Sequence, residues 1–292
     1  MNSNRATTFG LLAILLWSTM VGLFRAVTEA LGPVGGAAMI YTCSGILLMF
    51  TVGFPDLRHI PRKYLLAGSI LFTCYEICLA LSLGYASTRQ QAIKASIINY
   101  LWPGLTVLFA ILFIDQKASW WVLPGMLLSI GGVVRVLGGE SGMNIADILH
   151  NVKSSPLSYF LAFSGAFIWA AYCTVTRKYA HGKNVITLFI MITAVTLWIK
   201  YALGAQPIMH FSIQAALQLL LTAVALGFGY AAWNVGILYG NVTLLATASY
   251  FTPVISSAIA SVLLNTTLSW GFWLGGLMVC SGSLLCWVAT RR

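Results

Sequence analysis

The stretch NYLWPGLTVLFAILF, residues 99–113, returns 150 positions later as SYFTPVISSAIASVL, residues 249–263. At this shift Tyr100 aligns with Tyr250 and Pro103 with Pro253, with no gap in either copy. The same register pairs Ala110 with Ala260 within the stretch. Beyond the stretch it pairs Ser119, Trp120, Gly125 and Gly132 with Ser269, Trp270, Gly275 and Gly282. Matched proline, tryptophan and glycine residues at a single offset indicate an internal repeat.

The composition places these repeats in a membrane. Of the 292 residues, 16 are Lys or Arg and 6 are Asp or Glu, so 8% are charged and 59% are hydrophobic. The mean hydropathy is +0.88, whereas about a quarter of a soluble domain is charged. These values exclude a cytosolic enzyme, a nucleic-acid-binding domain and a disordered chain, although a net charge of +10 would suggest nucleic acid in a soluble protein.

Apolar runs separated by polar or turn-rich breaks predict ten transmembrane helices. We place them at residues 6–24, 33–54, 64–85, 95–113, 119–137, 157–176, 184–203, 212–236, 243–264 and 268–290. The first run is longer than the apolar core of a signal peptide and has no Ala-x-Ala site before Arg25, so it reads as a span. The 27 glycines favour closely packed helices over a β-barrel.

The spans divide into two repeats of five. A shift of 152 pairs Trp17 with Trp169 and Arg25 with Arg177. We assign residues 1–137 to the first repeat, 138–156 to an extracytoplasmic linker and 157–292 to the second repeat. Since five is odd, the repeats must enter the bilayer in opposite senses, an arrangement typical of secondary transporters with a site near the bilayer midplane.

The linker has its own pattern. Ile145, Ile148, Leu149 and Val152 follow the helical spacing i, i+3, i+4, i+7, and we expect Asn144 before them to be the N-cap. We expect a short amphipathic helix at the outer membrane interface.

Positive charge orients the chain. With the N-terminus inside, ten Lys and Arg residues fall in the inner gaps and six on the outer side. This bias predicts that both termini are cytoplasmic.

Long strings across the chain resemble the drug/metabolite transporter superfamily with its paired EamA repeats. They include LLWSTMVGL (15–23), YEICLALSLGYA (75–86), GAFIWAAYCTVT (165–176) and YAAWNVGILYGNVT (230–243). More closely, the chain is similar to bacterial exporters of aromatic amino acids. The resemblance implies an all-α membrane protein of ten helices around a central cavity, located in the bacterial inner membrane and working by alternating access.

Glu76 is the only acidic residue near the middle of a predicted span. A charge at membrane depth costs several kcal/mol unless it is paired, neutralised or facing a cavity. Glu76 therefore either contacts substrate or carries a proton, or it is a structural group that ties two helices together.

Aromatic and amide side chains deep in the spans form the rest of the candidate site. Trp169 and Tyr172 share one helical face, and each repeat carries a tyrosine just ahead of its helix-breaking proline. Tryptophans near span ends fit an interfacial belt better; these are Trp120, Trp121, Trp270, Trp273 and Trp287. The full candidate set for substrate binding is Trp17, Tyr75, Glu76, Asn99, Tyr100, Trp102, Trp169, Tyr172, Trp233, Asn234 and Tyr250.

Aromatic rings around a cavity suit an aromatic substrate, through stacking, or an organic cation, through cation–π attraction. We expect export of aromatic amino acids, with export of hydrophobic cations, drugs or other small metabolites as the alternative.

An intramembrane enzyme would need a nucleophile with a base, or a metal cluster, at membrane depth. The six Cys lie in apolar runs and the four His in or beside the gaps, so we expect no catalytic residues, no metal and no cofactor. No Walker A motif is present, so ATP is not the expected energy source. The expected partners are the substrate and the lipid bilayer, with no nucleic acid, and we expect a monomer.

Overall fold

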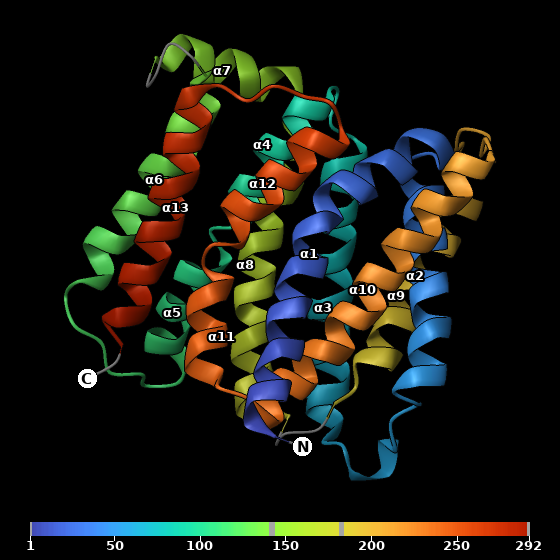
Figure 1. The fold of residues 1–292 in the computed structure, drawn as a ribbon, viewed down its shortest axis with the longest axis horizontal. Coiled ribbons are helices and arrows are strands. Elements are labelled where there is room, and N and C mark those ends of the chain that lie inside the picture. The colour runs from blue at the N-terminus through green and yellow to red at the C-terminus, as the bar shows by residue number, and fades with distance from the viewer. Residues whose placement is uncertain (1, 140–143, 181–183, 291–292) are drawn as a thin grey trace. The chain divides into compact units, whose positions relative to one another are not determined.

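The computed structural model of the chain describes residues 2–139, 144–180 and 184–290, and all regular structure within these ranges is helical (Figure 1). Eight of the described helical segments are long and apolar enough to cross a bilayer. Two further apolar helices, Val122–Leu137 and Thr252–Leu263, are shorter. The chain is therefore an all-α protein with the segments of a multi-pass membrane protein.

The helices pack into two compact units, each built from both halves of the chain. Unit 1 comprises Met1–Leu57 and Asn184–Asn265, and unit 2 comprises Arg58–Lys183 and Thr266–Arg292. Packing thus divides the chain differently from the sequence repeats.

Unit 1 joins two N-terminal helices to four from the second half. Its helices are α1 (Ser3–Leu31), α2 (Pro33–Thr51), α9 (Ile186–Leu203), α10 (Ile213–Tyr239), α11 (Val242–Ser249) and α12 (Thr252–Leu263). The Ser44 hydroxyl on α2 donates to the Ala223 carbonyl on α10 at 3.1 Å, and the Trp198 indole on α9 donates to Thr42 at 2.9 Å. These bonds satisfy polar groups within the unit, as a lipid environment requires.

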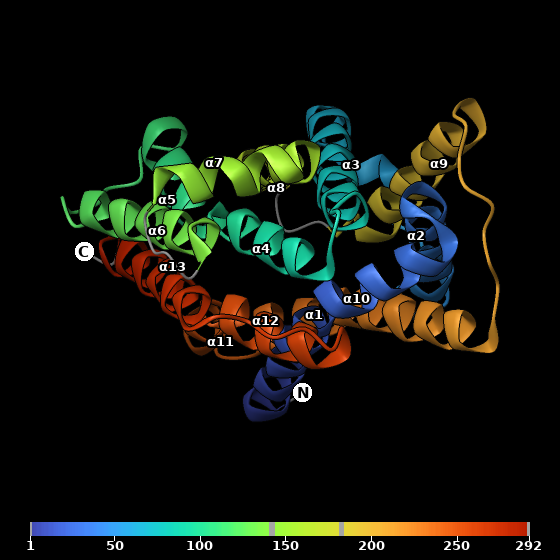
Figure 2. The same cartoon turned by 90° about the horizontal axis from the view of Figure 1, so that it is seen from above.

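Unit 2 contains the rest of the first half and the last helix. After a 3-10 turn at Leu57–His59, its helices are α3 (Arg62–Gly84), α4 (Arg89–Asn99), α5 (Trp102–Phe113), α6 (Val122–Leu137), α7 (Ile145–Ser154), α8 (Pro156–Tyr179) and α13 (Trp270–Val288). α6 and α13 lie side by side in both ribbon views (Figures 1 and 2). The predicted amphipathic helix is present as α7, and Asn144 caps it by accepting a hydrogen bond from Ala146 N at 2.9 Å.

Two predicted spans are broken at equivalent places. α4 ends at Asn99 and α5 begins at Trp102; α11 ends at Ser249 and α12 begins at Thr252. Asn99 lies four residues before Pro103, and Ser249 lies four residues before Pro253. In a continuous helix each proline ring would clash with the carbonyl four residues earlier. The chain tightens instead: Leu101 N donates to Ile98 O and Phe251 N donates to Ala248 O, each at 3.1 Å.

The predicted end of the first span was wrong. α1 continues to Leu31, seven residues beyond the expected residue 24, and the left-handed Gly32 (φ 79°) ends it. Arg25, which directly follows the predicted span, lies inside the helix and is 8% exposed. Its guanidinium pairs with Glu29 one turn later, at 2.9 Å, so the charge is compensated and the helix continues.

Glycines allow α6 and α13 to approach backbone to backbone. A Cβ on Gly132 would lie 2.5 Å from the Gly275 carbonyl oxygen, and one on Gly125 would lie 2.8 Å from the Gly282 carbonyl oxygen. Between the two pairs, the Ser129 hydroxyl donates to the Val279 carbonyl at 3.4 Å. Because Gly125 faces Gly282 and Gly132 faces Gly275, the two helices run antiparallel. Close contact through small residues is a common way for membrane helices to associate.

Candidate functional site

A cluster of aromatic rings surrounds Trp169 in unit 2. Its ring centroid lies 4.3 Å from that of Tyr75, 4.9 Å from that of Tyr172, and 6.2 Å from those of Phe72 and Trp102. We call these five residues the Trp169 cluster. Phe72 and Tyr75 lie three residues apart on α3, as do Trp169 and Tyr172 on α8, so each pair shares one helical face. The cluster thus forms where α3 and α8 pack together.

Asn99 joins the cluster to the break between α4 and α5. Its amide Nδ2 donates to the Ala162 carbonyl on α8 at 3.3 Å, and its Oδ1 accepts from the Tyr75 hydroxyl at 3.5 Å. Asn99 is 4% exposed. Gly165 makes room for this amide, because a Cβ there would lie 3.0 Å from Nδ2. The end of α4 is therefore held against α8, and Trp102, the first residue of α5, is placed beside Trp169.

Trp17 forms a smaller aromatic cluster in unit 1. Its ring centroid lies 5.3 Å from that of Tyr230, edge to face, and 5.3 Å from that of Trp233. α1 crosses α10 closely at this point, because a Cβ on Gly229 would lie 2.6 Å from the indole Nε1 of Trp17. Trp17, Tyr230 and Trp233 form the Trp17 cluster.

The remaining predicted residues take separate positions. Glu76 lies on α3 next to Tyr75 and is 3% exposed. Tyr100 and Tyr250 are partly buried at the equivalent breaks, each as the C-cap residue that directly follows its helix. Asn234 belongs to α10, but its side chain lies outside the part of the chain that the structure describes. The structure therefore brings six of the predicted residues into the two ring clusters, and Asn99 is hydrogen-bonded to one of them.

Two members of these clusters were missing from the predicted set. Phe72 contacts both Trp169 and Tyr172, the latter at 5.4 Å between ring centroids. Tyr230 packs edge to face against Trp17. The signal for Phe72 was its spacing of three residues from Tyr75, which puts both rings on one face of a helix.

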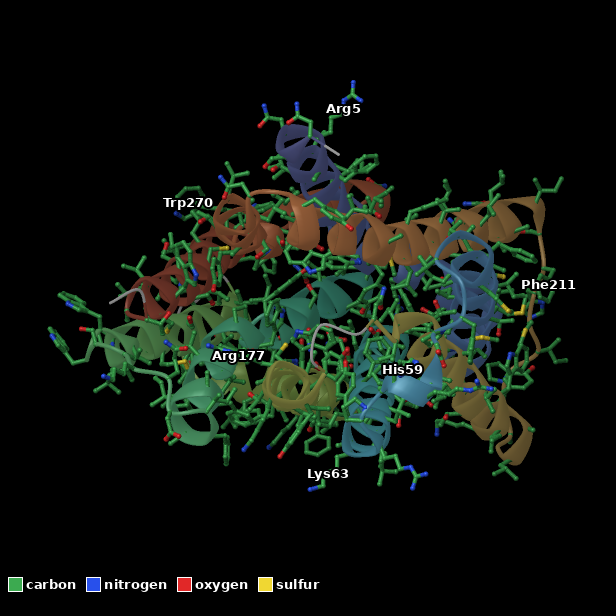
Figure 3. The ribbon with its side chains drawn as sticks, turned by 90° about the horizontal axis from the view of Figure 1, so that it is seen from below. Arg5, His59, Lys63, Arg177, Phe211 and Trp270 are labelled. Carbon is green, nitrogen blue, oxygen red and sulfur yellow. The ribbon has the colours of Figure 1, made fainter. Side chains whose placement is uncertain are left out.

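The tryptophans assigned to an interfacial belt are distinct from these clusters. Trp120 is 70% exposed and Trp270 is 77% exposed. Trp120 stacks on Trp121 at 4.5 Å. Figure 3 shows Trp270 at the start of α13, pointing away from the helices. Exposed rings of this kind fit contact with lipid headgroups.

Comparison with known proteins identifies close relatives. The chain is 63% identical over 292 residues to the aromatic amino acid exporter YddG of Salmonella typhimurium, and equally to that of Escherichia coli strain K12; each alignment covers 100% of both chains. The aromatic amino acid exporter YddG of Ancylobacter novellus is 25% identical over 268 residues, 90% of each chain. A protein of known crystal structure superposes with a TM-score of 0.70 over 99% of each chain at 24% identity, which supports the fold alone.

The sequence profile of the EamA-like transporter family matches the chain twice, at residues 4–138 and 156–288. The two matches together cover most of the sequence. The chain therefore belongs to the EamA-like transporter family.

Proposed function

We propose that this chain exports the aromatic amino acids tryptophan, phenylalanine and tyrosine from the cytoplasm across the bacterial inner membrane, as a secondary transporter working by alternating access. The observation that carries the proposal is its 63% identity, over the complete length, to exporters of that class.

The Trp169 cluster supports this substrate class. Trp169 meets its neighbours at tilted and edge-to-face angles, with interplanar angles from 32° to 81°. A substrate ring entering such a group gains stacking worth about 0.5–1.5 kcal/mol per ring pair beyond burial. Glu76 and Asn99 are the candidate partners for the substrate's ammonium group.

The proposed architecture has ten spans in two inverted repeats around a central cavity. Counting α4 with α5, and α11 with α12, as single broken spans and adding α6 gives ten. The α6–α13 contact supports the inversion. At a shift of 150, Gly125 corresponds to Gly275 and Gly132 to Gly282, so the contact Gly125–Gly282 maps onto Gly275–Gly132. The repeat thus exchanges the roles of α6 and α13 and leaves the pair of contacts the same. A two-fold relation between two segments produces contacts of this kind.

Equivalent aromatic contacts occur in both units. Trp17 corresponds to Trp169 at the shift of 152, and each tryptophan packs on a tyrosine of the partner helix, Tyr230 on α10 or Tyr75 on α3. Discontinuous helices near the midplane are a recurrent feature of transporters built from inverted repeats. The α4–α5 and α11–α12 breaks match that feature.

Counterflow in proteoliposomes tests the proposal. Labelled tryptophan and phenylalanine should exchange into vesicles preloaded with unlabelled tryptophan, whereas a lipophilic quaternary ammonium ion without an indole ring should neither exchange nor compete. Running the assay with and without a pH gradient separates proton coupling from facilitated diffusion. Cation exchange without tryptophan exchange would replace the proposal with the alternative, a cation exporter in which Glu76 and the rings bind positive charge.

A further inference from the structure

A second cavity lies in unit 2, apart from the Trp169 cluster, near the starts of α4 and α13. Its volume is about 410 Å³, and it is lined by Gln90, Lys94, Gly139, Thr267, Leu268 and Ser269. Cavities of this size hold small-molecule ligands, commonly about 300–1,000 Å³. No residue of the predicted site lines it.

Lys94 is the charged residue of this lining. It lies in the second turn of α4 and is only 7% exposed. Among the residues that the structure describes, none forms a hydrogen bond or an ion pair with its ammonium group. Burial of a charged group without a partner is costly. A buried ammonium group that lines a cavity therefore points to an anion bound there.

The described walls of the cavity carry no acid. The chain has six acidic residues, and the five that the structure describes lie elsewhere; they are Glu29, Asp56, Glu76, Asp115 and Asp147. The sixth, Glu140, follows Gly139 in the sequence and lies outside the described residues. The test below therefore includes it.

Three neighbouring hydrogen bonds fix the walls of the cavity. Two of them involve a positive group, the N-terminus of α13 or Arg135. Ser269 caps α13 by accepting a hydrogen bond from Phe272 N at 3.2 Å, so the positive end of this helix dipole meets the cavity. Arg135 Nη1 donates to the carbonyl of Gly139 at 2.8 Å and fixes a residue whose φ of 64° is in the left-handed region. Gln90 Nε2 donates to the carbonyl of Thr267 at 3.4 Å and holds the opposite wall.

We propose that this cavity is a carboxylate subsite, in which the Lys94 ammonium group binds the α-carboxylate of the transported amino acid; this inference rests on the function proposed above. Lys94 precedes Asn99 by five residues on α4, about 7.5 Å along the helix axis. A substrate leaving the Trp169 cluster for Lys94 needs only a short movement along α4. In the predicted topology this movement is directed outward, so the subsite lies on the exit side.

Substrate analogues that each lack one charged group separate this role from others. In tryptophan counterflow, indole-3-propionate keeps the carboxylate and tryptamine keeps the ammonium group, and both should inhibit the unaltered protein. Lys94→Met should raise the half-maximal concentrations of tryptophan and indole-3-propionate about tenfold to a hundredfold, the usual effect of losing a charge-assisted hydrogen bond. Inhibition by tryptamine should be unchanged, which also shows that the variant is folded.

Matched variants complete the experiment. Lys94→Arg should keep most of the carboxylate selectivity, and Lys153→Met, at an exposed lysine of α7, should behave like the unaltered protein. Vesicles of phosphatidylcholine alone should give the same selective loss, because the anion is the substrate's and not a lipid phosphate.

Four results would overturn the proposal. Equal losses for tryptamine and indole-3-propionate would mean that Lys94 only shapes the helix. A Glu140→Gln variant with the selective loss of Lys94→Met would identify an internal ion pair instead. Unchanged selectivity in Lys94→Met, with tryptophan still exchanged, would reject the subsite and leave the proposed function standing. Failure of the unaltered protein to exchange tryptophan would reject the proposed function itself and the subsite with it.

Discussion

At the scale of single residues, Trp169 shows how spacing along two helices builds a ring cluster. Phe72 and Tyr75 approach it from α3, and Tyr172 follows it by one turn on α8. None of these contacts needs an unusual backbone, because residues three apart share a helical face wherever the helix is regular. What positions the remaining ring, that of Trp102, is the break that precedes α5.

Replacing Trp169 with alanine should lower kcat/KM for tryptophan about tenfold or more, since several ring contacts worth about 0.5–1.5 kcal/mol each are lost. Trp169→Phe should retain most of the activity because a ring remains. The control is Trp270→Ala, at a position that is 77% exposed, which should transport normally. Proteoliposome uptake normalised to folded protein is the measurement, and equal losses in Trp169→Ala and Trp270→Ala would assign Trp169 to packing.

Glu76→Gln should raise the apparent KM for tryptophan while turnover and folding are maintained, because a neutral amide attracts the substrate's ammonium group less than a carboxylate does. The measurement is initial uptake across a range of tryptophan concentrations, with and without a pH gradient. An unchanged KM together with loss of the pH-gradient response would instead identify Glu76 as a proton carrier. If KM, turnover and pH response all stay the same, the group is structural.

At the scale of elements, the close antiparallel contact of α6 and α13 depends on glycine. Gly125 and Gly132 lie seven residues apart and meet Gly282 and Gly275, which are also seven apart, so the two backbones touch at two places along the contact. Two backbones in such contact gain dispersion energy and short carbonyl contacts that larger side chains would prevent.

Gly132→Ala should therefore destabilise the protein by about 1–3 kcal/mol, because its new methyl group meets the Gly275 carbonyl oxygen, which cannot move aside as a side chain can. The neighbouring Gly131→Ala is the matched control, since its Cβ would meet only the terminal methyl of Met278, at 3.3 Å. Thermal unfolding in detergent measures both. If both variants share the Tm of the unaltered protein, the backbone contact contributes little to stability.

Local sequence rules predicted these elements unevenly. The spacing of Ile145, Ile148 and Leu149 predicted α7. Pro103 and Pro253 indicated a carbonyl without its helical partner, but the spans around them were predicted as continuous, and the breaks were not. The end of α1 was missed, because hydropathy stops at Arg25 while the Arg25–Glu29 pair lets the helix continue. Lys94 was counted only as a topology charge, since its burial depends on residues 267–269, far along the chain.

At the scale of the whole molecule, the chain is a family member whose sequence repeats and packing units differ. The family profile matches residues 4–138 and then 156–288, one match after the other. The packing units instead combine an N-terminal segment with a distant one. Periodicity within one sequence reveals repeats, but it holds no information on which repeat a helix will pack against. The packing of helices from one repeat against helices of the other could therefore not be predicted.

The predicted topology can be tested with a matched pair of asparagines. Asn144 and Asn184 are both exposed, and the Lys/Arg bias places the first outside and the second in the cytoplasm. In an active variant freed of its six native cysteines, Asn144→Cys should react with an impermeant thiol reagent in intact cells. Asn184→Cys should react only after the cells are opened. The reverse pattern would invert the topology and with it the direction assigned to transport.

The composition of unit 1 has a consequence for synthesis on the ribosome. About 130 residues separate Leu57 from Asn184, where the remaining part of the unit begins. At about 5–20 residues per second, α1 and α2 wait roughly 6–25 s in the bilayer before their partner helices emerge. During that interval Gly10 of α1 cannot make its contact with Gly236, because α10 has not yet been synthesised. For several seconds, therefore, α1 and α2 of the nascent chain lack the other helices of unit 1, and an insertase or chaperone can bind them during that time.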